Sequence, residues 1–174
     1  MPEQPESLRV AAGWVRKADN DLKNASHTLK LAEDCPTDTV VFHAQQCVEK
    51  YLKALLVVDG IDFPRTHSLS VLVELLEESK RPALTTEEQE RLNDYAATTR
   101  YPGDYEDISL EEARRATAIA ARVRGEAREK LPRQALKFES PEASDRGTSR
   151  PAVTPPASDE TPPPPEPPAK PPSP

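Results

Sequence analysis

Hydrophobic residues recur at alternating steps of three and four along the first part of the chain. The stripe consists of Leu8, Ala11, Val15, Ala18, Leu22, Ala25, Leu29 and Ala32. One narrow apolar face of this kind predicts a helix that packs against a partner in a bundle. Trp14 lies beside the stripe and is expected to cover one edge of it. Proline blocks helix continuation, so Pro36 and the two residues before it should end this helix.

A second helix is predicted from the cap at Thr37 or Asp38 to a stop at Gly60. Its apolar face is much broader than that of the first helix. The face contains Val40, Val41, Ala44, Cys47, Val48, Tyr51, Leu52, Leu55, Leu56 and Val58. A helix with so wide an apolar surface is expected to lie at the centre of the bundle, in contact with several others.

Three more helices follow. A short one begins at Ser68 and breaks at Pro82. Thr86 with Gln89, and Ser109 with Glu112, have the spacing of capping boxes and are expected to open the fourth and fifth helices. Pro102-Gly103 should end the fourth helix, and Pro132 the fifth. Short connections favour antiparallel neighbours. The predicted fold is therefore all-α, an antiparallel up-and-down bundle of four or five helices over residues 1–132.

Residues 133–174 contain most of the twenty prolines of the chain. Such a segment cannot bury enough apolar surface to fold, so a disordered tail with polyproline II character is predicted. One interpretation is an inert, solubilising tail. The other is a protein-interaction module, in which the tail binds an aromatic-lined, proline-specific groove on another protein.

Charge and cysteine content narrow the function classes. Residues 1–131 carry 18 Lys and Arg against 24 Asp and Glu, which argues against a protein that coats nucleic acid, and no DNA partner is expected. A local basic groove remains compatible with this balance. The two cysteines, Cys35 and Cys47, are expected to be reduced thiols, with Cys47 in the core.

The chain shows no basic-then-apolar leader and no apolar run of about 18 residues, so a soluble, cytoplasmic protein without membrane contact is predicted. Its three histidines, His27, His43 and His67, lie far apart without paired ligands. No metal site and no cofactor are therefore expected.

Three motifs in order resemble those of HEPN domains, a family named for higher eukaryotes and prokaryotes nucleotide-binding. The first is the segment 42–56, FHAQQCVEKYLKALL. The second is Gly60-Ile61 followed by residues 64–69, PRTHSL, and the third is residues 99–102, TRYP, ahead of a final helix rich in Glu and Ala. The resemblance covers about residues 10–130. Its third motif resembles that of the Arg-Tyr-Pro branch of the family.

The resemblance implies a helical bundle that commonly dimerises. It also implies a partner, because many members are encoded beside a minimal nucleotidyltransferase as one half of a toxin–antitoxin pair. Many toxic members are metal-independent ribonucleases in which an Arg and, a few residues later, a His meet across the dimer groove. Arginine can stabilise charge on a phosphate, and histidine can move a proton near neutral pH.

The sequence departs from that ribonuclease pattern. No histidine follows Arg100, and only one residue separates Arg65 from His67. The main interpretation is therefore a non-catalytic or regulatory nucleotide- or RNA-binding partner of a minimal nucleotidyltransferase, acting as a homodimer. The alternative is a metal-independent ribonuclease toxin that uses Arg100 with His67 or His43.

Five residues are candidates for nucleotide contacts: Arg100, Tyr101, Tyr105, Lys50 and Lys53. A planar guanidinium beside aromatic rings suits phosphate and base contacts. The structural alternative for Arg100 is an ion pair with a neighbouring acid, Asp104 or Glu106. For the two lysines it is a solvated helix face paired with Glu49.

The remaining polar residues of the motifs have structural interpretations. His43 is expected to be half-buried and bonded to a neighbouring helix. His67, just before a helix start, is expected to order the loop by hydrogen bonding to backbone. A buried amide must find partners, so Gln45 and Gln46 are expected to cross-link helices or to bridge a dimer.

Overall fold

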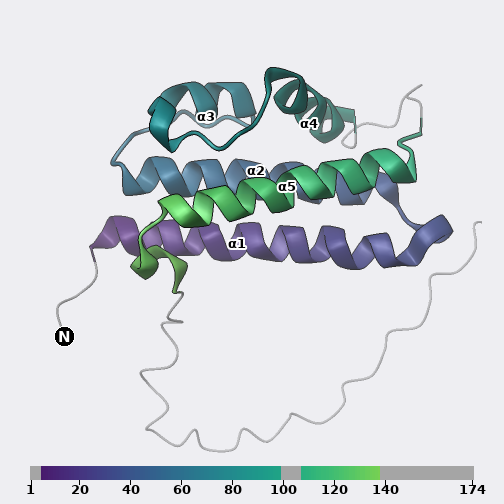
Figure 1. The fold of residues 1–174 in the computed structure, drawn as a ribbon, viewed down its shortest axis with the longest axis horizontal. Helices are drawn as coiled ribbons and strands as arrows, with labels where there is room; N and C mark the ends of the chain where they lie inside the picture. The colour runs from purple at the N-terminus through teal and green to yellow at the C-terminus, as the bar shows by residue number, and fades with distance from the viewer. Residues whose placement is uncertain (1–4, 99–106, 138–174) are drawn as a thin grey trace, which may run out of the picture. The chain divides into compact units, whose positions relative to one another are not determined.

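The computed structural model describes residues 5–98 and 107–137, which are helical throughout apart from connections (Figure 1). No strand occurs in these two ranges. The α-helices are α1 (Glu6–Thr28), α2 (Thr37–Val58), α3 (Leu69–Leu75), α4 (Thr86–Thr98) and α5 (Leu110–Lys130). Three short 3-10 turns accompany them: η1 (Leu29–Asp34), η2 (Glu78–Lys80) and η3 (Arg133–Leu136). The predicted all-α bundle is confirmed.

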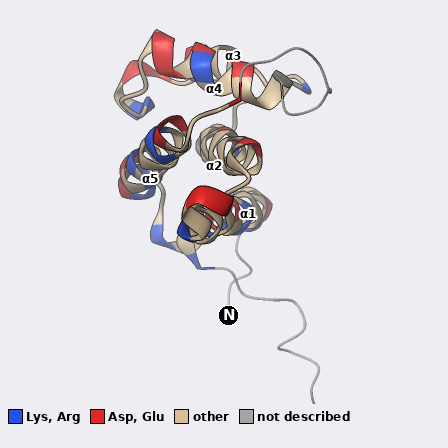
Figure 2. Cartoon of the chain, turned by 90° about the vertical axis from the view of Figure 1, so that its right-hand side faces the viewer, with Lys and Arg blue, Asp and Glu red and all other residues tan. Residues whose placement is uncertain are grey.

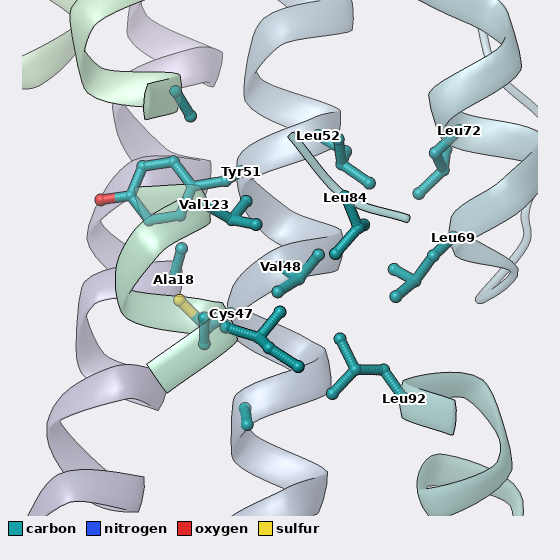
Figure 3. Close-up of a cluster of buried hydrophobic side chains, with 14 of the residues drawn as sticks. Ala18, Cys47, Val48, Tyr51, Leu52, Leu69, Leu72, Leu84, Leu92 and Val123 are labelled. Atoms are coloured by element: carbon teal, nitrogen blue, oxygen red, sulfur yellow. The ribbon is translucent and has the colours of Figure 1, made fainter. Parts of the chain in front are cut away.

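Helix α2 lies at the centre of the bundle, as its broad apolar face predicts. It runs antiparallel to α1 and contacts α1, α3, α4 and α5 (Figure 1). Charged residues lie mainly on the outward sides of the helices around α2 (Figure 2). The core extends from α1 through α2 to α3 (Figure 3). Tyr51 and Leu52 of α2 and Leu72 of α3 are fully buried in it.

Small side chains let the long helices approach α2 closely. Ala11, Ala18 and Ala25 lie seven residues apart on α1 and are fully buried. Ala113, Ala120 and Ala127 repeat the same spacing on α5 and are also fully buried. Trp14 packs against the edge of this core, as predicted. Cys47 is buried and unbonded, and burial raises the pKa of its thiol, so its role is packing.

The helix ends agree with the sequence at three places and differ at others; α3, for example, ends at Leu75 rather than at the predicted break at Pro82. Ser109 and Glu112 form the predicted capping box at the start of α5. Ser68 precedes α3, and Gly60 ends α2 with a φ of 69°. The box of α4 is one residue earlier than predicted, because Thr85 rather than Thr86 exchanges hydrogen bonds with Glu88.

The predicted cap of α2 is wrong. No side chain caps this helix, and Pro36 occupies the capping position. The carboxylate of Asp38 instead accepts a hydrogen bond from the backbone N–H of Thr39, at 2.7 Å. Because the proline has already set the backbone direction into the helix, α2 begins without a side-chain acceptor.

An ordered turn continues beyond the predicted end of the bundle at residue 132. The 3-10 turn η3 contacts α1, and Ala135 within it is fully buried. Leu131, just before it, is also buried. The last element of the bundle thus folds back onto the first.

Candidate functional site

A buried carboxylate organises the connection between α2 and α3. The side chain of Glu49, on α2, is 3% exposed and forms an ion pair with Lys53 one turn later, at 2.8 Å. The amide of Gln45 donates to the same carboxylate at 3.1 Å and to the backbone carbonyl of His67 at 3.2 Å. Gln46 donates to it as well, at 3.3 Å. We call these residues, together with His67, the Glu49 cluster.

The Glu49 cluster keeps its carboxylate ionised. Burial alone would raise the pKa of Glu49, but the hydrogen bonds from Lys53, Gln45 and His67 outweigh it and hold the pKa below its ordinary value. An ionised carboxylate has no proton to give. The Nδ1 atom of His67, at 3.1 and 3.3 Å from the two oxygens of Glu49, must therefore carry the hydrogen of this bond.

His67 presents its other ring nitrogen outward. Its side chain is 60% exposed although Glu49 beneath it is buried. With its Nδ1 bonded to the carboxylate, the neutral ring keeps Nε2 as a free acceptor. The ring borders a hollow of about 230 Å³, lined by His67, Ser68, Asn93, Ala96 and Ala97. This hollow lies between the start of α3 and the last turns of α4.

Lys53 fixes the connection that carries His67. Its ammonium donates to the carbonyl of Thr66 at 3.1 Å and lies 5.4 Å from the ring centre of Trp14 and 5.7 Å from that of Phe63. Cation–π contacts of this length favour a charged lysine in an otherwise apolar setting. The connection before α3 is therefore tied to both α1 and α2.

A second carboxylate cluster lies between α1 and α2. Asp21 accepts a hydrogen bond from Nδ1 of His43, at 2.9 Å, and forms an ion pair with Lys50. The exposed fractions of the side chains are 24% for His43 and 17% for Lys50. Both partners project from α2 toward α1. We call these three residues the Asp21 cluster.

A model of the HEPN domain family matches residues 11–130. This is most of the chain, and it spans the bundle and both clusters.

The chain belongs to the HEPN domain family.

Two other proteins resemble the chain over most of the bundle. The protein named "Putative toxin MJ1304" from Methanocaldococcus jannaschii is 33% identical over 113 residues, which are 60% of this chain and 72% of the relative. The crystal structure of ST0689, an archaeal HEPN homologue, superposes with a TM-score of 0.55 at 25% identity. That match covers 70% of this chain and 98% of the homologue.

The site residues predicted from the sequence lie in different parts of the chain and have different surroundings. Arg100, Tyr101 and Tyr105 lie outside the described residues, as do the acids proposed to pair with Arg100, the stop at Pro102-Gly103 and the tail from residue 138. Lys53 belongs to the Glu49 cluster and Lys50 to the Asp21 cluster, so the two amines are directed to different carboxylates.

His43 is half-buried and bonded to α1, as expected. The expectation for His67 is wrong in its partner, because its ring bonds to the Glu49 side chain rather than to backbone. Gln45 joins α2 to the connection before α3 rather than to a second helix, and the amide of Gln46 bonds to Gln45 and Glu49 of its own helix.

Sequence reasoning missed the central position of Glu49. The available signal was the four-residue step from Glu49 to Lys53, which puts opposite charges on one side of a helix. On so broad an apolar face, the pair can be buried because each charge supplies the counter-charge of the other. Asn93, which accepts a hydrogen bond from the N–H of Leu69 at 3.2 Å, gave no sequence signal.

Two kinds of site are absent from the part of the chain that the structure describes. No group of three or more His, Cys, Asp or Glu side chains there could hold a metal ion. Within the same ranges, no helix has the length and apolar character needed to cross a membrane.

Proposed function

We propose that this HEPN protein is the toxin-like member of a two-protein pair, in which it binds a nucleotide or RNA and partners a minimal nucleotidyltransferase. The observation that carries the proposal is the hollow beside His67. Its lining combines three polar residues, His67, Ser68 and Asn93, with two alanines, whose small side chains leave room. The similarity to a relative named as a putative toxin supports the proposal that this pair is of the toxin–antitoxin kind.

The position of the hollow connects it with the Arg-Tyr-Pro motif. Ala97, in its lining, precedes Arg100 by only three residues. The chain between them can span at most about 10 Å, so a long arginine side chain can reach a phosphate held in the hollow. Arg100, Tyr101 and Tyr105 are the proposed direct contacts. Lys50 and Lys53, each held by a carboxylate, are proposed to contribute positive charge rather than contacts.

Binding is tested with ATP and with a short single-stranded RNA on the purified protein. Arg100→Ala should weaken binding of at least one of them about tenfold, since it removes a charge-assisted phosphate contact. Arg115→Ala is the matched control, because Arg115 is exposed and forms only a surface ion pair with Glu111. Equal binding by the two variants would remove Arg100 from the proposed site.

The partnership is tested by co-purification. A tagged copy of the chain should recover a nucleotidyltransferase encoded by a neighbouring gene, and light scattering should give the mass of a homodimer for the chain alone. Recovery of no such enzyme when the two genes are co-expressed would contradict the partnership.

A second candidate function is that of a metal-independent ribonuclease, and the bond between Glu49 and His67 favours it. A carboxylate that holds Nδ1 of a histidine fixes the tautomer and leaves Nε2 of the neutral ring as a proton acceptor. Purified protein should then cut RNA in the presence of EDTA, and His67→Ala should abolish the cutting. His43→Ala is the control, because His43 is held between helices. Intact RNA after incubation with the unchanged protein would contradict the ribonuclease function, and nucleotide or RNA binding would be the function that remains.

A further inference from the structure

The outward face of α1 carries a cation at every seventh residue. Arg9, Arg16, Lys23 and Lys30 have this spacing, and all four are exposed. Seven residues are nearly two helical turns, so the four side chains lie on one face about 10 Å apart, over a length of about 30 Å. We call them the α1 stripe. Lys30 lies in η1, which continues α1.

Between Arg9 and Lys30, Asp19 lies beside the α1 stripe, and its carboxylate, 32% exposed, is bound by Arg124 and Arg128. The positions four residues after the first three cations are Gly13, Asn20 and His27, of which the last two are exposed. Amide and imidazole groups can donate hydrogen bonds to phosphate and ribose oxygens. Further acidic residues lie at the two ends of the stripe. Glu6 pairs with Arg9 at 2.7 Å in a highly exposed pair, which contributes little in water.

The two acids within this part of α1 are directed into the bundle. Asp21 is bound by His43 and Lys50 of α2. Asp19 accepts hydrogen bonds from Tyr51 at 2.6 Å and from Arg124 at 2.7 Å. Because the acids are satisfied internally, the positive charge of α1 is presented outward.

Helix α5 extends the positive surface on one flank of the stripe. Arg124 and Arg128 both bind Asp19, which lies three residues after Arg16 and four before Lys23. Two guanidinium groups on one carboxylate leave a net positive charge beside the stripe. Arg124 remains 39% exposed and Arg128 29% exposed, so this charge faces solvent as well.

The layer formed by α3 and α4 carries a net negative charge. Residues 69–98, which contain α3 and α4, include seven acids and three basic residues. The acidic net charge of the chain therefore conceals a local cationic surface on α1 and its flank. A surface of this kind attracts and orients a polyanion at a distance.

We infer that the α1 stripe binds the phosphate backbone of single-stranded RNA. A straight row of separated cations with amide and imidazole groups between them matches a linear chain of phosphates. A membrane surface would need a continuous apolar face beside the cations, whereas α1 buries its apolar face in the core and the exposed Val10 and Leu31 lie far apart near the two ends of the stripe. The inference rests on the proposed function only in its choice of RNA as the anion.

The test measures binding of a fluorescent 20-nucleotide RNA without secondary structure at several salt concentrations. Four phosphate contacts predict a slope of about −3 in a plot of log K against log salt. Arg16→Gln with Lys23→Gln should weaken binding about tenfold at low salt and bring the slope to about −1.4, because two contacts are lost. Because both side chains are exposed, the melting temperature should fall by no more than a few degrees.

The matched control is Arg91→Gln with Arg115→Gln, which changes the net charge equally on another face. Both arginines form exposed surface pairs within their own helices. The control should keep the slope of the unchanged protein. Equal loss of binding in the two double variants would show a net-charge effect only and would overturn the inference.

Two further outcomes separate this inference from the proposed function. His67→Ala and Arg100→Ala should leave the salt slope within about one unit, because each removes at most one phosphate contact. Loss of the nucleotidyltransferase from the Arg16 and Lys23 double variant, with RNA binding intact, would assign the stripe to a protein partner and overturn the inference. The same would hold if this variant lost binding to phosphatidylserine vesicles but not to RNA.

Discussion

The Glu49 cluster and the Asp21 cluster share three kinds of charged or titratable group, although the Glu49 cluster adds Gln45 and Gln46. Each has one buried carboxylate, one lysine and one histidine bonded through Nδ1. They differ in exposure, since the side chain of His43 is 24% exposed and that of His67 60%. One histidine joins two helices, whereas the other stands at the edge of a hollow. A carboxylate, a lysine and a histidine therefore serve packing in one place and a candidate site in the other.

The largest expected effect follows from removing the charge of Glu49. Glu49→Gln should lower the free energy of unfolding by about 3–5 kcal/mol, because Lys53 then stays buried without a counter-charge. Urea unfolding followed by the fluorescence of Trp14, which lies beside Lys53, measures the change.

The double variant Glu49→Gln with Lys53→Met is the control for this prediction. It removes both charges and keeps the length of the lysine side chain, so most of the lost stability should return. A loss below about 1 kcal/mol in the single variant would mean that Lys53 reaches water when its partner is removed.

The corresponding change in the Asp21 cluster should have a smaller effect. Asp21→Asn is expected to cost about 1–3 kcal/mol, because Lys50 is partly exposed and can be solvated when the carboxylate is lost. The same unfolding measurement applies. A cost equal to that of Glu49→Gln would remove the energetic distinction between the two clusters.

Acid should reduce the difference between the unchanged protein and Glu49→Gln. The pKa of Glu49 is lower in the folded protein than its ordinary value of 4.5. Its contribution to stability is therefore present above pH 4.5 and is lost as the pH falls through the folded pKa. Melting temperatures between pH 7 and pH 3 should converge for the two proteins.

Glu88→Gln is the comparison for this acid effect. The pKa of Glu88 is also lowered: burial acts against the shift, and the hydrogen bonds from Arg122 and Thr85 outweigh it. Glu88 is more exposed than Glu49, so the convergence should be weaker for this variant. A stability difference for Glu49→Gln that does not change with pH would show that the carboxyl is already neutral in the fold.

The smallest effect on stability is expected for His67. His67→Gln should change the free energy of unfolding by less than about 0.5 kcal/mol, as is usual for an exposed side chain. His43→Gln should cost about 1 kcal/mol through the lost bond to Asp21. RNA or nucleotide binding should show the reverse order. If His43→Gln lost more binding than His67→Gln, the Asp21 cluster rather than the Glu49 cluster would be the candidate binding site.

The order and type of the helices could be predicted from the sequence because each depends on local patterns. The stripe of α1, the glycine after α2 and the box at Ser109 all act within one or two turns. The cap of α4 was wrong by one residue because Thr85 and Thr86 both precede an acceptor three positions later. Local spacing alone does not choose between them.

The polar clusters could be predicted only in part because they depend on contacts between distant segments. That His43 bonds to a neighbouring helix follows from its place on a broad helix face. That Arg124 and Asp19 meet requires helices α1 and α5 to pack together, across 105 residues of sequence. Sequence spacing carries no information on such a pair. The partner of His67 was missed for the same reason, since Glu49 lies 18 residues away.

The turn η3 has a practical consequence for shortening the chain. Ala135 closes onto α1 after the last long helix has ended. A protein truncated after Pro132 would leave that patch of α1 exposed to solvent and should aggregate more readily at high concentration. Truncation after Lys137 would retain the cover. Laboratories that trim the proline-rich end for crystallisation should cut on the far side of this turn.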